Sequence, residues 1–386
     1  MIYLDYAATT PMSAQAKKIY EQVATTYYGN ANSLHDPGSD AKQLLNASAS
    51  TLADLVHADP LEIHFTSSAT EANYLGIMAL LSAKEGNHII TSVMEHSSVA
   101  NVFDHLERQG YIVSRINVDD KGRLDMDHLK REIRKDTVMA SIQYVNSELG
   151  VIQDIEQISD ILNNAGVLIH TDAVQAFGRL PLDTGKLNIH GLTISGHKFY
   201  GPKGVGALYI SNKADWKPVM PVSPGKRKLK EGTADVPSIV SMVTAAKEIQ
   251  ADMLNEQARI SEFSKLLSDE LRRLPYEMII ESDHDQKVPN ILGLRFPGIE
   301  GQYLMLECNQ SGMAISTGSA CNIGSEEPST TMKALNRSAQ EAQQFVRLSF
   351  GLGSKKEQIP EIVQKMNVIL KRHFNKVKEH PKKIEE

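Results

Sequence analysis

The stretch IHFTSSATEAN, residues 63–73, decides the fold because it changes from a strand pattern to a helix pattern within a few residues. Residues 63–66 are a short apolar run of the kind that forms a strand. Ser67 and Ser68 then supply side chains that suit the start of a helix. A helical pattern follows from about residue 70 to residue 84. A strand that leads directly into a helix is the repeating unit of α/β proteins.

The same alternation of apolar runs and amphipathic stretches extends from about residue 60 to residue 210. Further strands are expected at 88–91, 111–113, 138–142, 167–170 and 192–195, with helices near 97–109 and 154–165. This pattern predicts α/β units around a mostly parallel sheet. Ligands of such sheets gather beyond the carboxyl ends of the strands, so reactive side chains are expected there.

The pattern changes after Pro237 to a long helical stretch that runs to about Leu274. Mixed elements follow, including apolar runs at 291–294 and 346–350. A chain of 386 residues exceeds the usual limit for a single core. We therefore expect a large α/β domain over residues 12–250 and a smaller α+β domain over 251–386, with the N-terminal segment 1–11 packed near the smaller one.

Composition excludes several classes of protein. Hydrophobic residues make up 41% of the chain and charged residues 23%, which is typical of a folded, soluble protein. A net charge of −6 argues against a broad nucleic-acid-binding surface. The sequence has no membrane-spanning run and no signal-peptide pattern, so we expect a cytoplasmic protein with no membrane partner and no direct nucleic-acid partner. Its two cysteines, Cys308 and Cys321, are then reduced thiols.

Lys198 is the first candidate for chemistry. It lies in SGHKFYGPKGVG, residues 195–206, just after an expected strand and beside a glycine-rich loop. A desolvated lysine loses its proton easily and can form a Schiff base. The alternative is a surface lysine on a turn. Lys203 is expected on the far side of the turn, and the segment does not have the spacing of a nucleotide-binding P-loop.

A phosphate-binding site is expected where the strand at 63–66 meets the following helix. Ala69 and Thr70 lie at the helix start, where backbone N–H groups have no partner within the helix. Taken alone, hydroxyl side chains at this place indicate only a helix cap. Together with a lysine that forms an imine, they predict a cofactor that has both an aldehyde and a phosphate, which is pyridoxal 5'-phosphate.

Three further side chains suit the ring of this cofactor. Asp172, at another strand end, is placed to pair with the pyridine nitrogen and so make the ring an electron sink. Gln175 is placed to hydrogen-bond the ring oxygen, and His96 to stack on the ring. The alternatives are a helix cap for Asp172 and a structural role for His96.

The two cysteines differ in their surroundings. Cys308 lies in the apolar run LMLEC, which indicates the core, whereas Cys321 lies in STGSACNIG, a run of small residues typical of a loop. An exposed loop cysteine is the better nucleophile, so we favour Cys321. Arg347 lies in an apolar strand pattern and offers a planar fork for a substrate carboxylate, with an internal salt bridge as the alternative.

Taken jointly, these segments resemble the cysteine desulfurases of the NifS/IscS type, in the class V (fold type I) aminotransferase superfamily. The resemblance begins with YLDYAATTP (3–11) and GNANSLH (29–35) and runs to RLSFG (347–351). It implies Lys198 as the lysine that binds the cofactor, and Lys198, Cys321 and His96 as the catalytic residues. The resemblance also places nine residues around the cofactor, namely Ala69, Thr70, His96, Ser147, Asp172, Gln175, Ser195, His197 and Thr233. Asn32 and Arg347 would bind substrate, and no metal is implied.

The resemblance also implies an activity. L-cysteine would become L-alanine, with its sulfur held as a persulfide on Cys321 and handed to an acceptor protein for iron–sulfur clusters, tRNA thiolation or sulfur-containing cofactors. It implies a homodimer in which Thr233 reaches the cofactor phosphate of the other subunit. A selenocysteine lyase or a small-amino-acid aminotransferase of the same fold, and a docking scaffold that has lost catalysis, are the alternatives.

Two departures from the family pattern stand out. The family reads VNNE where this chain has VNSE, so Ser147 replaces an asparagine that contacts cofactor and substrate. The segment before Thr233 is shorter and more basic than in the family, with Lys226, Arg227, Lys228 and Lys230. That run is either a solvated loop or a surface that steers an acidic partner.

Overall fold

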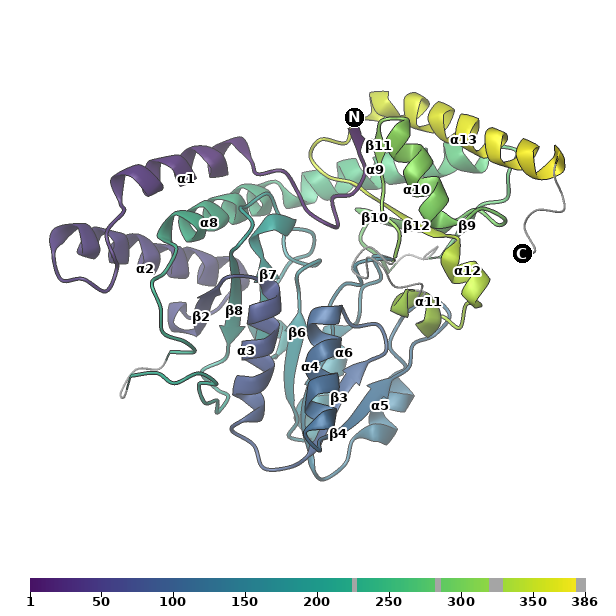
Figure 1. Cartoon of the computed structure of the whole chain (residues 1–386). Coiled ribbons are helices and arrows are strands. Elements are labelled where there is room, and N and C mark those ends of the chain that lie inside the picture. The colour runs from purple at the N-terminus through teal and green to yellow at the C-terminus, as the bar shows by residue number, and fades with distance from the viewer. Residues whose placement is uncertain (224–227, 282–285, 319–328, 380–386) are drawn as a thin grey trace.

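The structure is a computed structural model that describes residues 1–223, 228–281, 286–318 and 329–379 (Figure 1). Its centre is a seven-stranded sheet with the order β2-β8-β7-β6-β5-β3-β4. The strands are β2 (Ile63–Thr66), β3 (His88–Ser92), β4 (Ile112–Ile116), β5 (Thr137–Ser141), β6 (Leu168–Asp172), β7 (Gly191–Ser195) and β8 (Gly206–Ile210). The four pairs among β3 to β7 are parallel, which confirms the predicted α/β fold with a mostly parallel sheet.

Strand β8 was not expected from the sequence. It runs antiparallel to both of its neighbours, β7 and β2, and pairs Gly206 with Ser195 at one end of β7. The segment that holds Lys198, residues 196–205, is therefore the connection of a hairpin. Residues Gly196–Lys198 of this connection form a 3-10 turn.

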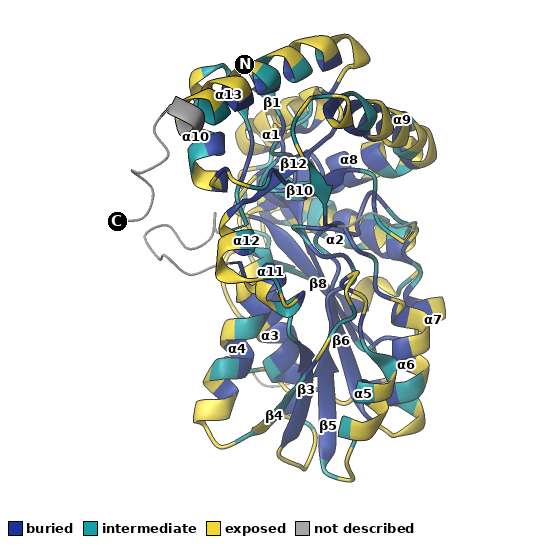
Figure 2. Cartoon of the chain, turned by 90° about the vertical axis from the view of Figure 1, so that its right-hand side faces the viewer, coloured by how far each residue is buried: buried dark blue, intermediate teal, exposed yellow. Residues whose placement is uncertain are grey.

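Helices cover both faces of the sheet (Figures 1 and 2). Neighbouring residues of a strand point to opposite faces, and here both faces are apolar. Ile89 and Met139 pack in the cluster that includes α3 (Ala69–Leu81) and α4 (Ser97–Arg108), whereas Ile90 and Ala140 pack in a second cluster. The other helices of this part are α1 (Ala14–Thr26), α2 (Asp36–Val56), α5 (Met126–Glu132), α6 (Ile155–Asn164), α7 (Thr184–Leu187) and α8 (Val236–Ala251), with a 3-10 turn at Pro60–Glu62.

The C-terminal part of the chain has its own small antiparallel sheet, in the order β12-β10-β9. A separate hydrophobic cluster joins Ile2 and Leu4 to residues between Ile260 and Leu370. Its elements are α9 (Met253–Arg272), β9 (Ile279–Ile280), β10 (Ile291–Arg295), α10 (Gly301–Gln310), β11 (Met313–Ala314), α11 (Thr330–Ala334), α12 (Ala339–Gln343), β12 (Phe345–Ser349), a 3-10 turn at Lys356–Gln358 and α13 (Ile359–Glu379). The single helical stretch expected to Leu274 is two helices, α8 and α9, that meet at Asp252.

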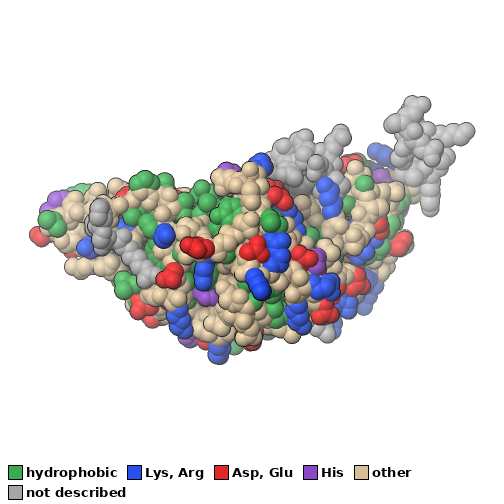
Figure 3. Space-filling model, turned by 90° about the horizontal axis from the view of Figure 1, so that it is seen from below, with side chains coloured by type: hydrophobic (Ala, Val, Ile, Leu, Met, Phe, Trp, Pro, Cys, Tyr) green, Lys and Arg blue, Asp and Glu red, His purple; other side chains and the backbone are tan. Residues whose placement is uncertain are grey.

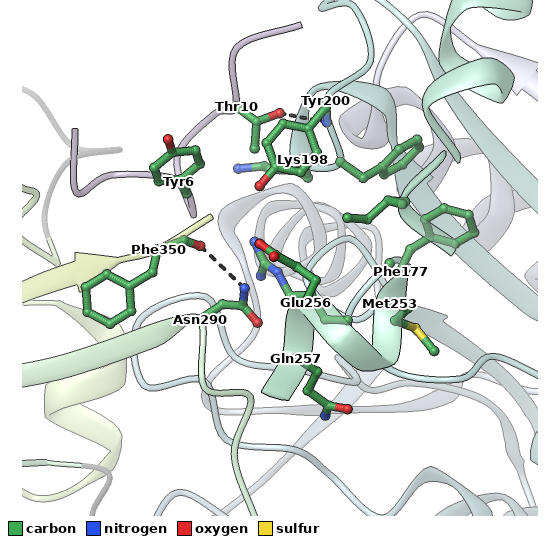
Figure 4. A pocket seen from close by; sticks show the side chains of 14 residues that line it. Tyr6, Thr10, Phe177, Lys198, Tyr200, Met253, Glu256, Gln257, Asn290 and Phe350 are labelled. Atoms are coloured by element: carbon green, nitrogen blue, oxygen red, sulfur yellow. Dashed lines mark hydrogen bonds between the residues drawn. The ribbon is translucent and has the colours of Figure 1, made fainter. Parts of the chain in front are cut away.

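The N-terminal segment connects the two parts. Strand β1 (Ile2–Tyr3) pairs in parallel with β11, and the chain then crosses to the hairpin that holds Lys198. There Thr10 N donates to His197 O at 2.9 Å. Tyr200 N donates to Thr10 Oγ1 at 2.8 Å, as Figure 4 shows. These bonds fix the segment against the carboxyl ends of the strands.

The surface mixes both signs of charge. On the face in Figure 3, basic and acidic side chains lie interspersed among polar and apolar ones. Among the described residues, none of the helices combines the length and the apolar character that crossing a bilayer requires.

Candidate active site

A cavity of about 760 Å³ lies at the carboxyl ends of the strands. Most of the predicted site residues line it, although they come from distant parts of the chain. These are Ala69, Thr70, His96, Ser147, Asp172, Gln175, Ser195, His197, Lys198 and Arg347. Because a parallel sheet brings its strand ends to one edge, residues far apart in sequence meet there.

Lys198 stands in the wall of this cavity. Its Nζ donates to the carbonyl oxygens of Ala7 and Ala8, at 2.7 and 2.8 Å. Behind it lies a second, much smaller cavity of about 20 Å³, which Lys198 also lines (Figure 4). Lys203, which follows Gly201 and Pro202 in the sequence, lines the large cavity as well.

One end of the cavity is rich in hydrogen-bond donors. Ser68 caps helix α3 by accepting from Glu71 N, and the next residues, Ala69 and Thr70, line the cavity. His197 is held through its Nδ1, 3.1 Å from Thr9 Oγ1. Burial, with the nearby lysines 198 and 203, lowers the pKa of His197 to about 4, so the ring is neutral near pH 7. The start of helix α3, in a cavity that Lys198 and Lys203 also line, favours an anion such as phosphate.

Asp172 and Gln175 lie deeper, at the end of β6. Asp172 accepts from Val174 N through Oδ1 at 2.9 Å and from Asn73 Nδ2 through Oδ2 at 2.8 Å. Gln175 donates from Nε2 to Ala7 O at 2.9 Å and accepts from Arg179. The helix-cap interpretation of Asp172 is wrong, because the residues that follow it form turns and the next helix, α7, begins only at Thr184; the carboxyl group lines the cavity.

Arg347 forms the internal ion pair that was the alternative interpretation, and it also lines the cavity. Its Nη2 lies 2.8 Å from Asp5 Oδ1, and its Nη1 donates to Ser147 O at 2.9 Å. The Nε atom is buried with no hydrogen-bond partner among the described residues. The guanidinium group therefore retains an unmet donor.

The structure tests the prediction for one of the two cysteines, Cys308. Cys308 is buried in the C-terminal hydrophobic cluster, which confirms its core assignment. Burial, followed by the charge of Glu307, raises the pKa of this thiol to about 12, so it is a poor nucleophile at neutral pH. Cys321 lies outside the described residues. Thr317 and Gly318 on one side of its segment and Ser329 on the other line the large cavity.

Two predicted residues do not line the cavity. Asn32 and Thr233 are both exposed, and neither is among the residues that line it. In the basic run, Lys228 lies 3.7 Å from Glu231, and Lys230 lies 2.7 Å from Glu71. Lys226 and Arg227 of the same run lie outside the described residues.

Sequence reasoning missed Glu95, which precedes His96 and also lines the cavity. Its Oε1 accepts from Ser92 Oγ at 2.6 Å and from Gln143 N at 3.0 Å, whereas Oε2 is buried without a hydrogen-bond partner in the described part of the chain. Burial raises the pKa of Glu95 to about 8, and the nearby Asp172 adds to this effect. The only signal in the sequence was its position beside His96.

The residues present fit pyridoxal 5'-phosphate. The cavity holds a lysine amine at its wall, a donor-rich end that suits a phosphate and a buried carboxylate that suits a pyridine nitrogen. Among the described residues, no group of three or more His, Cys, Asp or Glu side chains is placed to hold a metal ion.

Comparisons with known proteins agree with this geometry. The model of the family "Aminotransferase class-V" matches residues 2–362. NifS of Bacillus subtilis strain 168 is 42% identical over 96% of this chain and 94% of its own length. Cysteine desulfurase IscS of Pseudoalteromonas translucida is 38% identical over 95% of this chain and 91% of its own.

A solved structure named "SspA in complex with cysteine" is 30% identical, with a TM-score of 0.80 over 91% of this chain and 99% of that one. The predicted resemblance, which rested on motifs from residue 3 to residue 351, is thus confirmed along nearly the whole chain. The chain belongs to the class-V aminotransferases, a family of enzymes that depend on pyridoxal 5'-phosphate, and its relatives are of the NifS/IscS type.

Proposed function

We propose that this chain is a cysteine desulfurase, which converts L-cysteine to L-alanine and holds the sulfur as a persulfide on Cys321. One observation carries the proposal. The two flanks of the segment that contains Cys321, at Gly318 and Ser329, line the same cavity as Lys198 and Arg347. A cysteine carried between these flanks is tethered beside the site where an amino-acid substrate would bind. The names of relatives such as IscS support the same activity.

Different residues of the cavity carry out different steps of this reaction. Arg347 binds the substrate carboxylate and orients the amino acid. When bound, the cofactor supplies an electron sink for the charge left on the substrate α-carbon. Lys198 takes the α-proton at Nζ and later returns a proton to carbon, acting as general base and acid. The Ala7 and Ala8 carbonyls hold the Lys198 amine close to that position.

Sulfur transfer is assigned to Cys321. Its thiolate attacks the substrate sulfur, so that an S–S bond forms while the bond between the substrate sulfur and its β-carbon breaks. The electron pair of the broken bond stays with the carbon part, which takes up protons to become alanine. The sulfur is left on Cys321 as a persulfide. Cys308 is unsuited to this step because its thiol is buried in the core.

The persulfide is then handed to a sulfur-acceptor protein of the cytoplasm that serves iron–sulfur cluster assembly, tRNA thiolation or sulfur-containing cofactors. We also propose a large cofactor-binding domain over residues 12–250 and a small domain over 251–386 with segment 1–11 beside it. The separate hydrophobic clusters of the two parts support this division.

The proposal includes a two-fold homodimer. Asn32 and Thr233 are exposed and do not line the cavity of their own chain, which favours a role in the cavity of a second copy. Tyr28 and Leu34, on either side of Asn32 in the sequence, are 77% and 99% exposed. Apolar side chains with this exposure suit a protein interface.

Product analysis tests the activity. The purified enzyme loaded with pyridoxal 5'-phosphate should release alanine and sulfide in equal amounts from L-cysteine in the presence of a small thiol reductant. The Lys198→Ala variant, prepared in the same way, is the control and should release neither. Two results would reject the proposal. Consumption of the amino acid only when a keto acid is supplied indicates an aminotransferase, and turnover of selenocysteine without turnover of cysteine indicates a selenocysteine lyase.

A further inference from the structure

His96 is bound to the helix that follows it. It occupies the N-cap position of α4, and its Nδ1 accepts a hydrogen bond from the backbone N–H of Ser98, with an N···N distance of 3.2 Å. A backbone N–H group can only donate. The Nδ1 atom of His96 therefore carries no proton, and a neutral imidazole in this place has its proton on Nε2.

A contact with the Ser98 hydroxyl also favours an unprotonated Nδ1 on His96. Ser98 Oγ lies 2.8 Å from His96 Nδ1, and Asn73 Nδ2 donates to Ser98 Oγ at 2.9 Å. The same Asn73 amide donates its other proton to Asp172 Oδ2 at 2.8 Å. Because a carboxylate oxygen only accepts, Asp172 fixes which end of the Asn73 amide faces Ser98. The Ser98 hydroxyl, which accepts from Asn73, is then left to donate to His96.

The atoms of this chain of contacts are held firmly. Asn73 and Ser98 are buried, and Asp172 is 7% exposed. His96 itself is exposed and lines the large cavity. The distances therefore describe a continuous route from Asp172, through Asn73 and Ser98, to His96.

The charges around His96 come from several elements. Protein packed around the cavity withdraws the ring from bulk water and lowers the pKa of His96; the charge of Asp172 on β6 opposes this, and those of Lys198 and Arg347 add to it. Glu95 and Glu148 also line the cavity. The balance favours the neutral ring, in agreement with the hydrogen bonds at Nδ1.

We infer that Asn73 and Ser98 are positioning residues that hold His96 as the neutral tautomer with its proton on Nε2, so that His96 presents a hydrogen-bond donor to the cavity. The inference deepens the proposed function and rests on it for its importance to catalysis. In that reaction, His96 faces the substrate as a group that gives a proton or a hydrogen bond at Nε2. The tautomer itself is a property of this chain that can be measured without turnover.

Nitrogen NMR of the full-length protein with ¹⁵N-labelled histidine tests the tautomer, before and after pyridoxal 5'-phosphate is added. The His96→Gln variant identifies the His96 signals by their loss. We expect an unprotonated, pyridine-type signal from Nδ1 and a protonated, pyrrole-type signal from Nε2 at neutral pH. The reverse assignment, or two protonated nitrogens, would overturn the inference.

Variants test the positioning residues. Ser98→Ala removes a hydrogen bond to the neutral ring while keeping the backbone N–H, and it should raise the protonation constant of His96 about fivefold. Ser98→Thr retains the hydroxyl and should restore the wild-type value. Asn73→Ala removes the group that orients the Ser98 hydroxyl, so it should shift the constant in the same direction as Ser98→Ala.

A matched control is available in His88, whose Nε2 lies 2.9 Å from Ser114 Oγ. Ser114→Ala should move the His88 signals and leave those of His96 unchanged. An unchanged His96 protonation constant in a folded Ser98→Ala protein would remove Ser98 and Asn73 from this role, whatever Asn73→Ala does to folding. Because the readout is a nitrogen signal, a protein that failed to desulfurate cysteine would still decide the question.

Discussion

Asp5 and Arg347, 342 residues apart in the chain, form an ion pair with a distance of 2.8 Å between Oδ1 and Nη2. The pair joins the N-terminal segment to strand β12 in the wall of the large cavity. Two residues further along the same segment, Ala7 O accepts from both Lys198 and Gln175. Residues Ala7, Ala8 and Thr9 of the N-terminal segment therefore form part of the active-site wall.

We predict that the Asp5–Arg347 pair contributes measurably to stability. The two side chains are 20% and 8% exposed, so the charges are little screened by water. A double-mutant cycle with Asp5→Ala and Arg347→Ala, measured by urea unfolding, should give a coupling free energy of about 1–3 kcal/mol. The surface pair Asp119–Arg123, which is 33% and 46% exposed, is the control and should give less than about 1 kcal/mol. Equal coupling in the two cycles would contradict the assignment.

Lys198 is predicted to be the lysine that binds the cofactor. Its Nζ is held by two carbonyl oxygens in the cavity wall, whereas Lys203 is exposed at the edge of the same cavity. Borohydride reduction of the loaded enzyme, followed by peptide mapping, should place the pyridoxyl label on Lys198. The label should persist in Lys203→Ala and vanish in Lys198→Ala, and a label on Lys203 would refute the assignment.

Glu95 is predicted to make the protein less stable as the pH rises. Its pKa in the folded protein is about 8, above the ordinary value of 4.5, so the folded state binds more protons than the unfolded state between these pH values. The free energy of unfolding therefore falls from pH 4.5 to pH 8 because of this group. Glu95→Gln copies the protonated form and should be more stable than wild type at pH 9, on the order of 2 kcal/mol.

Urea unfolding from pH 5 to pH 9 measures this difference. The exposed Glu107, whose pKa is lowered by the hydrogen bond from Arg115, is the control. Glu107→Gln should differ from wild type by an amount that stays constant over this range. A constant difference for Glu95→Gln as well would show that Glu95 is already ionised in the folded protein at pH 5.

Much of the fold and the site followed from the sequence because strand ends and helix starts are local patterns. Strands β2 to β7, and the meeting of Thr70, Asp172 and Lys198 at one edge, follow from the order of elements. Strand β8 was missed because it is the second strand of the hairpin that holds Lys198 and pairs antiparallel with β7. The alternation of strand and helix patterns along the sequence predicts parallel strands and does not indicate such a hairpin. Glu95 was missed because its chemistry comes from tertiary burial. An internal ion pair of Arg347 was among the alternatives, but its partner, Asp5, was not identified because it lies at the opposite end of the chain.

A mixed dimer tests the role of Thr233 in a second copy. Thr233→Glu should expel the cofactor phosphate by like-charge repulsion, and Lys198→Ala should remove the reacting amine, so each homodimer should be inactive. After refolding together, about half of the dimers should be mixed with one intact site of two, which restores roughly a quarter of wild-type activity. Mixed dimers that form without activity would place Thr233 outside the partner's site.

The central claim is that substrate sulfur passes to Cys321, and one measurement addresses it directly. The loaded enzyme is given L-cysteine carrying radioactive sulfur without a reductant, then denatured, alkylated and digested. We predict label on the peptide that contains Cys321, with alanine formed in equal amount, and no label on the peptide that contains the buried Cys308. Label on Cys308, or alanine without any labelled peptide, would contradict the account.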